Sequence, residues 1–162
     1  MFIESVNTGK VQTQPWRSGT ASALHKTACH GSIEVSKMGL LGDEQADRKN
    51  HGGADKAVFV MPMANYERFG IARPFGFLGE NLTVSGPDET QVCLGDRLQI
   101  DDLLLEVMQP RSPCWKLGQQ ACSVEGLRSA SDFLNVYSES GRVGFYCRVL
   151  QTGAVQMGDE LN

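Results

Sequence analysis

The stretch "RVGFYCRVL" (residues 142–150) decides the fold class, because its apolar residues alternate along the chain. Val143, Phe145, Cys147 and Val149 fall on one face of an extended backbone, and the residues between them fall on the other. This period of two is typical of a β-strand with one face in a protein core. We therefore expect a strand here, with Cys147 packed inside.

Similar short runs recur along the rest of the chain, each next to a Gly, Pro or Asp turn signal. Runs at such spacing predict an all-β barrel or sandwich. Two segments have helical spacing instead, residues 63–72 and residues 123–141, and the second has Ser123 or Ser131 as a candidate cap and Gly141 as its end. The expected strands lie in "MFIESVNT", "KVQTQ", "GSIEVS", "AVFVMP", "ENLTV", "DRLQI" and "LLLEVM".

Length and composition indicate one globular domain. The chain has 162 residues, of which 41% are hydrophobic, and this is enough for one core. The net charge of −4 without blocks of like charge does not predict nucleic-acid binding. The N-terminal "MFIESVNTGK" lacks the apolar segment of a signal peptide, and no apolar run is long enough to cross a bilayer. We expect a cytoplasmic protein that does not contact membranes.

The cysteines do not form a disulfide or zinc pattern. Their number, five, is odd, no two are spaced as CxxC, and the three histidines are not at zinc-ligand spacing from them. We therefore expect no disulfide and no structural zinc. Four of the five are expected to be packing residues: Cys29, Cys93, Cys122 and Cys147.

The fifth, Cys114, lies in an unusual stretch, "QPRSPCWKL" (residues 109–117), directly after an apolar strand. Pro110 and Pro113 cannot donate into a strand ladder, and they restrict the direction in which the thiol points. Arg111 is a permanent cation that favours the thiolate, the form that attacks substrates or binds metals. The alternative is a buried core cysteine beside a surface arginine, which the usual burial of unpaired cysteines favours.

A second polar stretch, "GDEQADRKNHGGADKAVFVM" (residues 42–61), delivers His51, Gly52 and Gly53 just before an apolar strand. Two consecutive glycines allow close approach of a ligand, and their amides can cradle an anion. A solvated loop with a Gly-Gly turn is an equally good interpretation when this stretch is taken alone.

Two further stretches have polar residues at strand entrances. In "GENLTVSG" (residues 79–86), Glu80 and Asn81 are adjacent, so at most one of them faces a given site. In "GRVGFYC" (residues 141–147), Arg142 lies between the expected helix and the following strand. Turn chemistry and a surface position explain these residues equally well when each stretch is considered alone.

The four stretches in this order resemble the MOSC domain, which is named for the C-terminal domain of molybdenum cofactor sulfurase, and in particular its YiiM-type branch. The motifs that carry the resemblance run from about residue 39 to residue 117, and "GRVGFYCRVLQTGAVQMGDEL" extends it nearly to the end of the chain. The resemblance implies a mostly β fold, a closed barrel related to the pyruvate-kinase barrel with a few short helices. It implies a single MOSC domain over residues 1–162.

The resemblance also implies chemistry. Members of this family bind the molybdenum cofactor (molybdopterin) or transfer sulfur, and the cysteine matched by Cys114 carries sulfur or ligates molybdenum. On this basis Cys114 is the expected catalytic residue and metal ligand. The residues expected to bind the cofactor are Arg111, His51, Gly52, Gly53, Asn81 and Arg142.

Two functions are compatible with these expectations. The first is a reductase of N-hydroxylated bases or related small N-oxygenated compounds, which receives electrons from an external electron-donor protein. The second is a carrier or sulfuration module that holds a persulfide on Cys114 and turns over no substrate. The oligomeric state stays open, a homodimer included. Under either function, we expect Cys114 in a loop after a strand, partly exposed in a cleft lined by Arg111, with residues 51–53 and 80–81 at its mouth.

Overall fold

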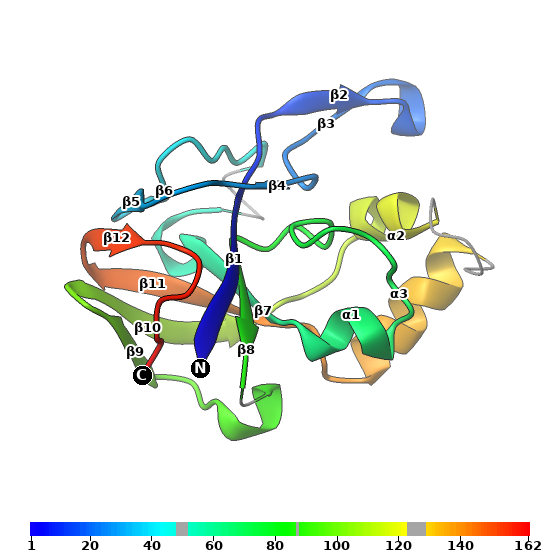
Figure 1. Ribbon diagram of the computed structural model, residues 1–162. Coiled ribbons are helices and arrows are strands. Elements are labelled where there is room, and N and C mark those ends of the chain that lie inside the picture. The colour runs from blue at the N-terminus through cyan, green and yellow to red at the C-terminus, as the bar shows by residue number, and fades with distance from the viewer. Residues whose placement is uncertain (48–51, 87, 123–128) are drawn as a thin grey trace.

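The computed structural model describes residues 1–47, 52–86, 88–122 and 129–162. Figure 1 shows strands on one side of the molecule and helices on the other, with a β-hairpin projecting above them. The strands are β1 (Phe2–Thr8), β2 (Gln12–Gln14), β3 (Thr20–Ser22), β4 (Thr27–Ala28), β5 (Ile33–Ser36), β6 (Gly39–Leu40), β7 (Val58–Pro62), β8 (Leu82–Ser85), β9 (Arg97–Ile100), β10 (Leu103–Pro110), β11 (Phe145–Gln151) and β12 (Gly153–Val155). The helices are α1 (Ala64–Arg68), α2 (Trp115–Ala121) and α3 (Ala130–Glu139), with short 3₁₀ turns η1 (Trp16–Ser18), η2 (Ala54–Lys56) and η3 (Glu89–Gln91).

The main element is a seven-stranded sheet with the order β4-β1-β8-β7-β11-β10-β9. All neighbours pair antiparallel except β7 and β8, which are parallel. The alternation in β11 predicted from the sequence is confirmed, because Phe145, Cys147 and Val149 are buried in the core. A second sheet has the order β12-β5-β6, and β2 pairs with β3 to form the projecting hairpin.

The mostly β fold class is confirmed, but the prediction of a closed barrel is wrong. The large sheet curls into a half-barrel, and within the described residues no ladder joins its edge strands β9 and β4. The C-terminal residues lie between β9 and β1 instead. Asn162 exchanges two backbone hydrogen bonds with Gln99 of β9, and Phe2 of β1 forms an isolated bridge with Glu160. These few contacts cover the gap without supplying the full row of hydrogen bonds that barrel closure requires.

The large sheet is buried on both faces, which gives the molecule three layers. One face packs against the small sheet around Val35, Leu40 and Val155. The opposite face packs against the three helices around Phe59, Met61 and Tyr137. Strand β7 contributes alternate side chains to both cores, and all five of its residues are buried. Its continuous apolar sequence, "VFVMP", is what a central strand between two layers requires.

The helices differ from the sequence expectations in their boundaries. The helix expected over residues 63–72 is confirmed in its first half only, as α1. The side chain of Ser129 caps α3 by accepting a hydrogen bond from Asp132 N at 3.0 Å, so Ser131 is not the cap, and Ser123 lies outside the described residues. Helix α2 was not expected; its Gly118 lies so close to α3 that an added Cβ would be 2.8 Å from Ala130 O. Within the described residues, no helix is both long and apolar enough to span a membrane.

Candidate functional site

A cleft opens where the β2–β3 hairpin, the segment after β6 and the loop after β10 meet. It encloses about 650 Å³, part of it open to solvent. The predicted site residues Cys114, Arg111 and Asn81 all line this cleft. They come from positions 81 to 114 of the chain, so the fold brings together residues that are far apart in the sequence.

Cys114 lies at the end of a short loop that begins where β10 ends at Pro110. Its backbone is extended, and its carbonyl oxygen accepts a hydrogen bond of 3.0 Å from Leu117 N in the first turn of α2. The residue is half-buried and its side chain borders the cleft. The prediction of a partly exposed thiol in a loop after a strand is confirmed.

Arg111 is almost fully buried, with 5% of its surface exposed. Its backbone N–H donates to Gly144 O at 3.0 Å, and its Nη1 donates to Leu78 O at 2.6 Å. The guanidinium carbon also lies 4.8 Å from the centre of the Phe59 ring, a cation–π contact. The alternative of a core cysteine beside a surface arginine is therefore wrong, because the arginine is buried and the cysteine is half-exposed.

The Asn81 side chain joins three segments at the floor of the cleft. Its Oδ1 accepts from Phe59 N at 3.0 Å, and its Nδ2 donates to Asn7 O at 3.3 Å and to Asp43 Oδ2 at 2.9 Å. Both donors and one acceptor of the amide are thus used within the protein. Asn81 lines the cleft, but its hydrogen bonds indicate that it positions Asp43 and strand β7.

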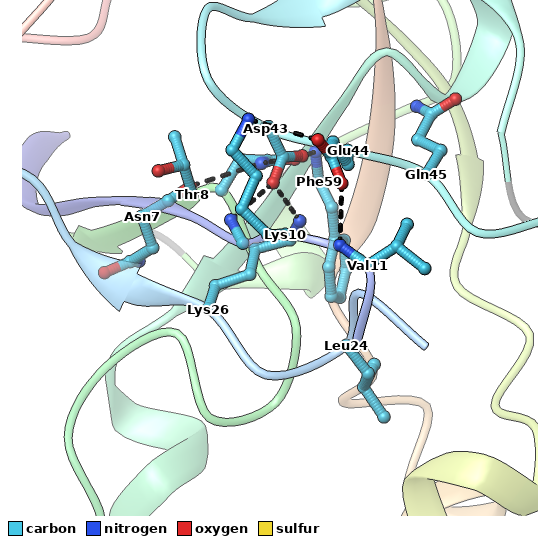
Figure 2. A network of polar contacts seen from close by, with 12 residues as sticks. Asn7, Thr8, Lys10, Val11, Leu24, Lys26, Asp43, Glu44, Gln45 and Phe59 are labelled. Atoms are coloured by element: carbon cyan, nitrogen blue, oxygen red, sulfur yellow. Dashed lines mark hydrogen bonds and ion pairs between the residues drawn. The ribbon is translucent and has the colours of Figure 1, made fainter. Parts of the chain in front are cut away.

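Asp43 and Lys26 form an ion pair in the same floor, with 2.5 Å between Lys26 Nζ and Asp43 Oδ1. Both side chains are less than 10% exposed. Asp43 Oδ1 also accepts from Gly9 N at 2.8 Å, and Figure 2 shows Asp43 between Lys26 and the segment that carries Lys10 and Val11. Buried carboxylates need such partners, so these contacts fix the segment after β6 against β1.

The neighbouring Glu44 fixes the entrance to the hairpin. Its Oε2 accepts from Val11 N at 2.8 Å, and its Oε1 lies 3.2 Å from Lys10 Nζ (Figure 2). The backbone hydrogen bond from Val11, followed by the contact with Lys10, lowers the pKa of Glu44 below its ordinary value. At the far end of the hairpin, Arg17 covers the Trp115 ring at 4.0 Å.

Glu80 points away from the cleft. Because Glu80 and Asn81 are adjacent, only one of them was expected to face the site, and that one is Asn81. Glu80 is fully buried, and its Oε1 accepts from Tyr66 OH at 2.6 Å, from Gly76 N at 2.7 Å and from Thr83 Oγ1 at 2.9 Å. Burial raises the pKa of Glu80 above its ordinary value. The expectation that residues 80 and 81 together border the site is thus correct for Asn81 only.

Of the remaining predicted residues, Gly52, Gly53 and Arg142 are not among the described residues that line the cleft. Gly53 has a φ of 92°, which suits glycine, and its N–H donates to Gln45 Oε1 at 3.3 Å; Gln45 lines the cleft, whereas Gly52 and Gly53 do not. His51 lies outside the described residues. Arg142 is not near the cleft, because its Nη1 pairs with Asp88 Oδ2 at 2.6 Å next to η3. This acidic partner holds the guanidinium on another part of the surface.

All five cysteines are present as thiols. Cys147 is buried in the core, as predicted, but Cys93 and Cys122 are exposed, so the prediction that they are packing residues is wrong. Cys29 is half-buried, and its Sγ lies 3.2 Å from Thr8 Oγ1. Within the described residues, no group of three or more His, Cys, Asp or Glu side chains is arranged as a metal site.

Several residues of the cleft were missed by the sequence analysis. Lys26 lies in "HKTACH", where no turn or strand signal singles it out, and its burial depends on Asp43, 17 positions later. Phe59 and Tyr146 were assigned to strands, and their rings pack with 4.9 Å between centroids. Lys116, two positions after the predicted Cys114, donates from its Nζ to Ala21 O at 3.0 Å and so connects α2 to the hairpin.

The fold and the sequence both have clear relatives. A MOSC domain family model matches residues 47–162. The uncharacterized protein YflK of Bacillus subtilis is 36% identical over 98% of this chain and 71% of its own length, and the protein YiiM of Escherichia coli is 35% identical over 93% of this chain. A protein named reductase from Gibberella moniliformis is 32% identical over 97% of this chain. The chain spans 66% of the length of Escherichia coli YiiM and 28% of the fungal reductase.

Solved structures agree with these matches. The crystal structure of YiiM from Geobacillus stearothermophilus superposes with a TM-score of 0.74 at 32% identity, covering 99% of this chain and 73% of that one. The crystal structure of Escherichia coli YiiM gives a TM-score of 0.71 at 26% identity, covering 100% and 70%. The chain therefore belongs to the MOSC domain family, in the branch that contains YflK and YiiM.

Proposed function

We propose that this protein binds the molybdenum cofactor through Cys114 and reduces small N-hydroxylated compounds with electrons from a separate donor protein. The observation that carries the proposal is a half-exposed thiol that shares a cleft with a buried, permanently charged arginine. Membership of the MOSC family and a relative named reductase support the same reaction type.

The chemistry of the cleft fits this cofactor. A thiolate is the soft ligand that molybdenum would need, and Cys114 is the cysteine that lines the cleft among the described residues. The phosphate of the pterin would need cationic donors, and Arg111, Lys56 and Lys116 line the same space. Among the described lining residues there are four cationic side chains and three carboxylates, and Asp43 is already neutralised by Lys26.

When bound, the cofactor supplies a redox-active metal that exchanges electrons in pairs. The residues of this chain do the rest. Cys114 holds the metal, Arg111 keeps positive charge beside the thiolate, and the Asn81–Asp43–Lys26 network fixes the floor on which both depend. Reduction of an N-hydroxyl compound takes two electrons and two protons and releases an amine and water, so the reductant is the external donor protein.

A carrier function is the second candidate, and the accessibility of Cys114 favours it. A half-buried thiol at a cleft can accept sulfur from a donor persulfide: the donor S–S bond breaks, a new S–S bond forms on Cys114, and the donor leaves as a thiol. This exchange is balanced without an added oxidant. It needs the same cysteine but no substrate site.

One set of protein variants, made in a host that produces the cofactor, distinguishes the two proposed functions. Wild type, Cys114→Ser and Cys122→Ser are purified, and bound molybdenum, cyanide-releasable sulfur and hydroxylaminopurine reduction with a supplied donor are measured. Cys122→Ser is the matched control, because Cys122 is an exposed cysteine that does not line the cleft. A reductase loses metal and turnover in Cys114→Ser alone. A carrier shows releasable sulfur that Cys114→Ser abolishes, without turnover in any variant.

A further inference from the structure

A second cleft meets the first one at Cys114. It encloses about 660 Å³, part of it open to solvent, and it shares Cys114, Lys56 and Tyr146 with the first cleft. Its other walls come from Gln109 and from the loop that holds the thiol. Cys114 therefore borders both clefts, and the rest of the lining differs between them. Those other lining residues are Gln109, Pro110, Ser112 and Pro113.

A β-bulge places Gln109 in this second cleft. The register of β10 against β11 shifts between Val107 and Gln109, so Gln109 lies directly opposite Tyr146 where regular pairing would put Met108. Directly opposite residues of an antiparallel pair have their side chains on the same face. Bulges that re-aim a side chain are frequent next to active sites.

Gln109 and Tyr146 both carry polar groups, and both residues line the second cleft. Within the described residues, neither the Gln109 amide nor the Tyr146 hydroxyl has a hydrogen-bond partner, although both residues are half-buried. The Tyr146 ring is held by stacking on Phe59 at 4.9 Å and by Lys56, whose Nζ lies 5.8 Å from the ring centre. A phenol keeps its proton at neutral pH, so the Tyr146 hydroxyl can donate.

The walls of the second cleft favour a flat ligand that carries no positive charge. Pro110, Pro113 and the Tyr146 ring provide apolar surfaces, and no carboxylate is among the described residues that line it, so a cationic ligand would lack a partner. A glutamine amide offers one donor and one acceptor side by side, which matches the edge of an aminopurine in the way that glutamine pairs with adenine.

We propose that this second cleft is the substrate subsite, and that Gln109 selects N-hydroxylated aminopurines by pairing with the donor–acceptor edge of the base. The base lies between the prolines and Tyr146, with its hydroxylamino group toward Cys114 and the Tyr146 hydroxyl. The assignment of turnover rests on the proposed reductase function, whereas the binding site itself does not.

The test compares Gln109→Ala with Gln119→Ala, a glutamine that is exposed on α2 and lines neither cleft. Reduction of 6-N-hydroxylaminopurine and of phenylhydroxylamine, a flat substrate without the donor–acceptor edge, is measured with cofactor-loaded protein. Gln109→Ala should raise KM for the purine about three- to tenfold, the loss of a neutral hydrogen-bonded contact, and leave kcat unchanged. KM for phenylhydroxylamine, bound molybdenum and all constants of Gln119→Ala should stay at wild-type values.

Binding of adenine, measured by titration calorimetry, makes the result independent of turnover. If wild type binds adenine and Gln109→Ala binds it more weakly, the subsite stands even when no variant reduces anything, and only the reductase function is lost. Equal effects of Gln109→Ala and Gln119→Ala, or no adenine binding by wild type, overturn the subsite. A loss of molybdenum in Gln109→Ala also overturns it, because the second cleft would then hold the cofactor.

Discussion

Asn81→Ala should destabilise the protein strongly, because Asn81 connects three segments at the floor of the cleft. The substitution removes the hydrogen bonds to Phe59 N, Asn7 O and Asp43 Oδ2. Phe59 is 3% exposed and its N–H would be left in an interior that water does not reach. The resemblance to the MOSC family implied that Asn81 binds the cofactor, so this substitution separates a structural role from a ligand contact.

The magnitude follows from these three contacts. A buried N–H left without an acceptor costs about 1 to 3 kcal/mol, and each of the other two bonds contributes about 0.5 to 1.5 kcal/mol. The free energy of unfolding should therefore fall by about 2 to 6 kcal/mol, a large part of the total for a domain of this size. With a urea slope of about 2 kcal/mol/M, the unfolding midpoint should shift by about 1 to 3 M.

The assay is urea unfolding followed by tryptophan fluorescence, with Asn135→Ala as the matched control. Asn135 is exposed on α3, and its removal should change stability by less than about 0.5 kcal/mol. If Asn81→Ala unfolds at the same urea concentration as Asn135→Ala, the structural role is refuted. If it does so and also loses bound molybdenum, Asn81 is a ligand contact instead.

Three further outcomes test the site and its surroundings. Cys114→Ser should lose bound molybdenum and reductase activity while its melting temperature stays close to that of wild type, since the side chain is half-exposed in a loop; retained metal and turnover would contradict the proposed ligand. Cys147→Ser should do the opposite and lower the free energy of unfolding by about 1 to 3 kcal/mol, because a hydroxyl would be buried in an apolar core; unchanged stability in urea would contradict this. Burial raises the pKa of Glu80 above 4.5, so the unfolded chain releases this proton first and stability should fall as pH rises from 4.5 through the raised pKa; Glu80→Gln should flatten that slope in unfolding curves measured across pH, and an unchanged slope would assign it to another group.

The strands were predictable because their signals are local. The alternation in residues 142–150 and the apolar runs before it needed no information beyond their own sequence, and β11, β10 and β7 form where they were expected. The two prolines around Arg111 likewise located the loop after β10. The thiol and the cation of that loop could both be identified from the nine residues 109–117.

What the sequence did not reveal depends on distant partners. Lys26 belongs to the cleft because Asp43 is there, and Arg142 is excluded from it because Asp88 and Glu89 attract its guanidinium. The openness of the barrel depends on how the last residues meet β1 and β9, and no periodicity encodes that contact. The bulge that turns Gln109 outward is a one-residue offset between two strands, so neither strand shows it alone.

The pairing of β1 with β8 has a consequence for how the chain acquires its structure. Asn7 of β1 bonds to Thr83 of β8, which is 76 positions later, and the two strands lie side by side in the sheet (Figure 1). During synthesis β1 leaves the ribosome well before its partner has been made, and its apolar residues Ile3 and Val6 have nowhere to bury until then. Non-local pairing of this kind slows folding and prolongs the time for which an unpaired strand edge is open to other chains. The first eight residues therefore depend on protection from aggregation while the molecule is being made.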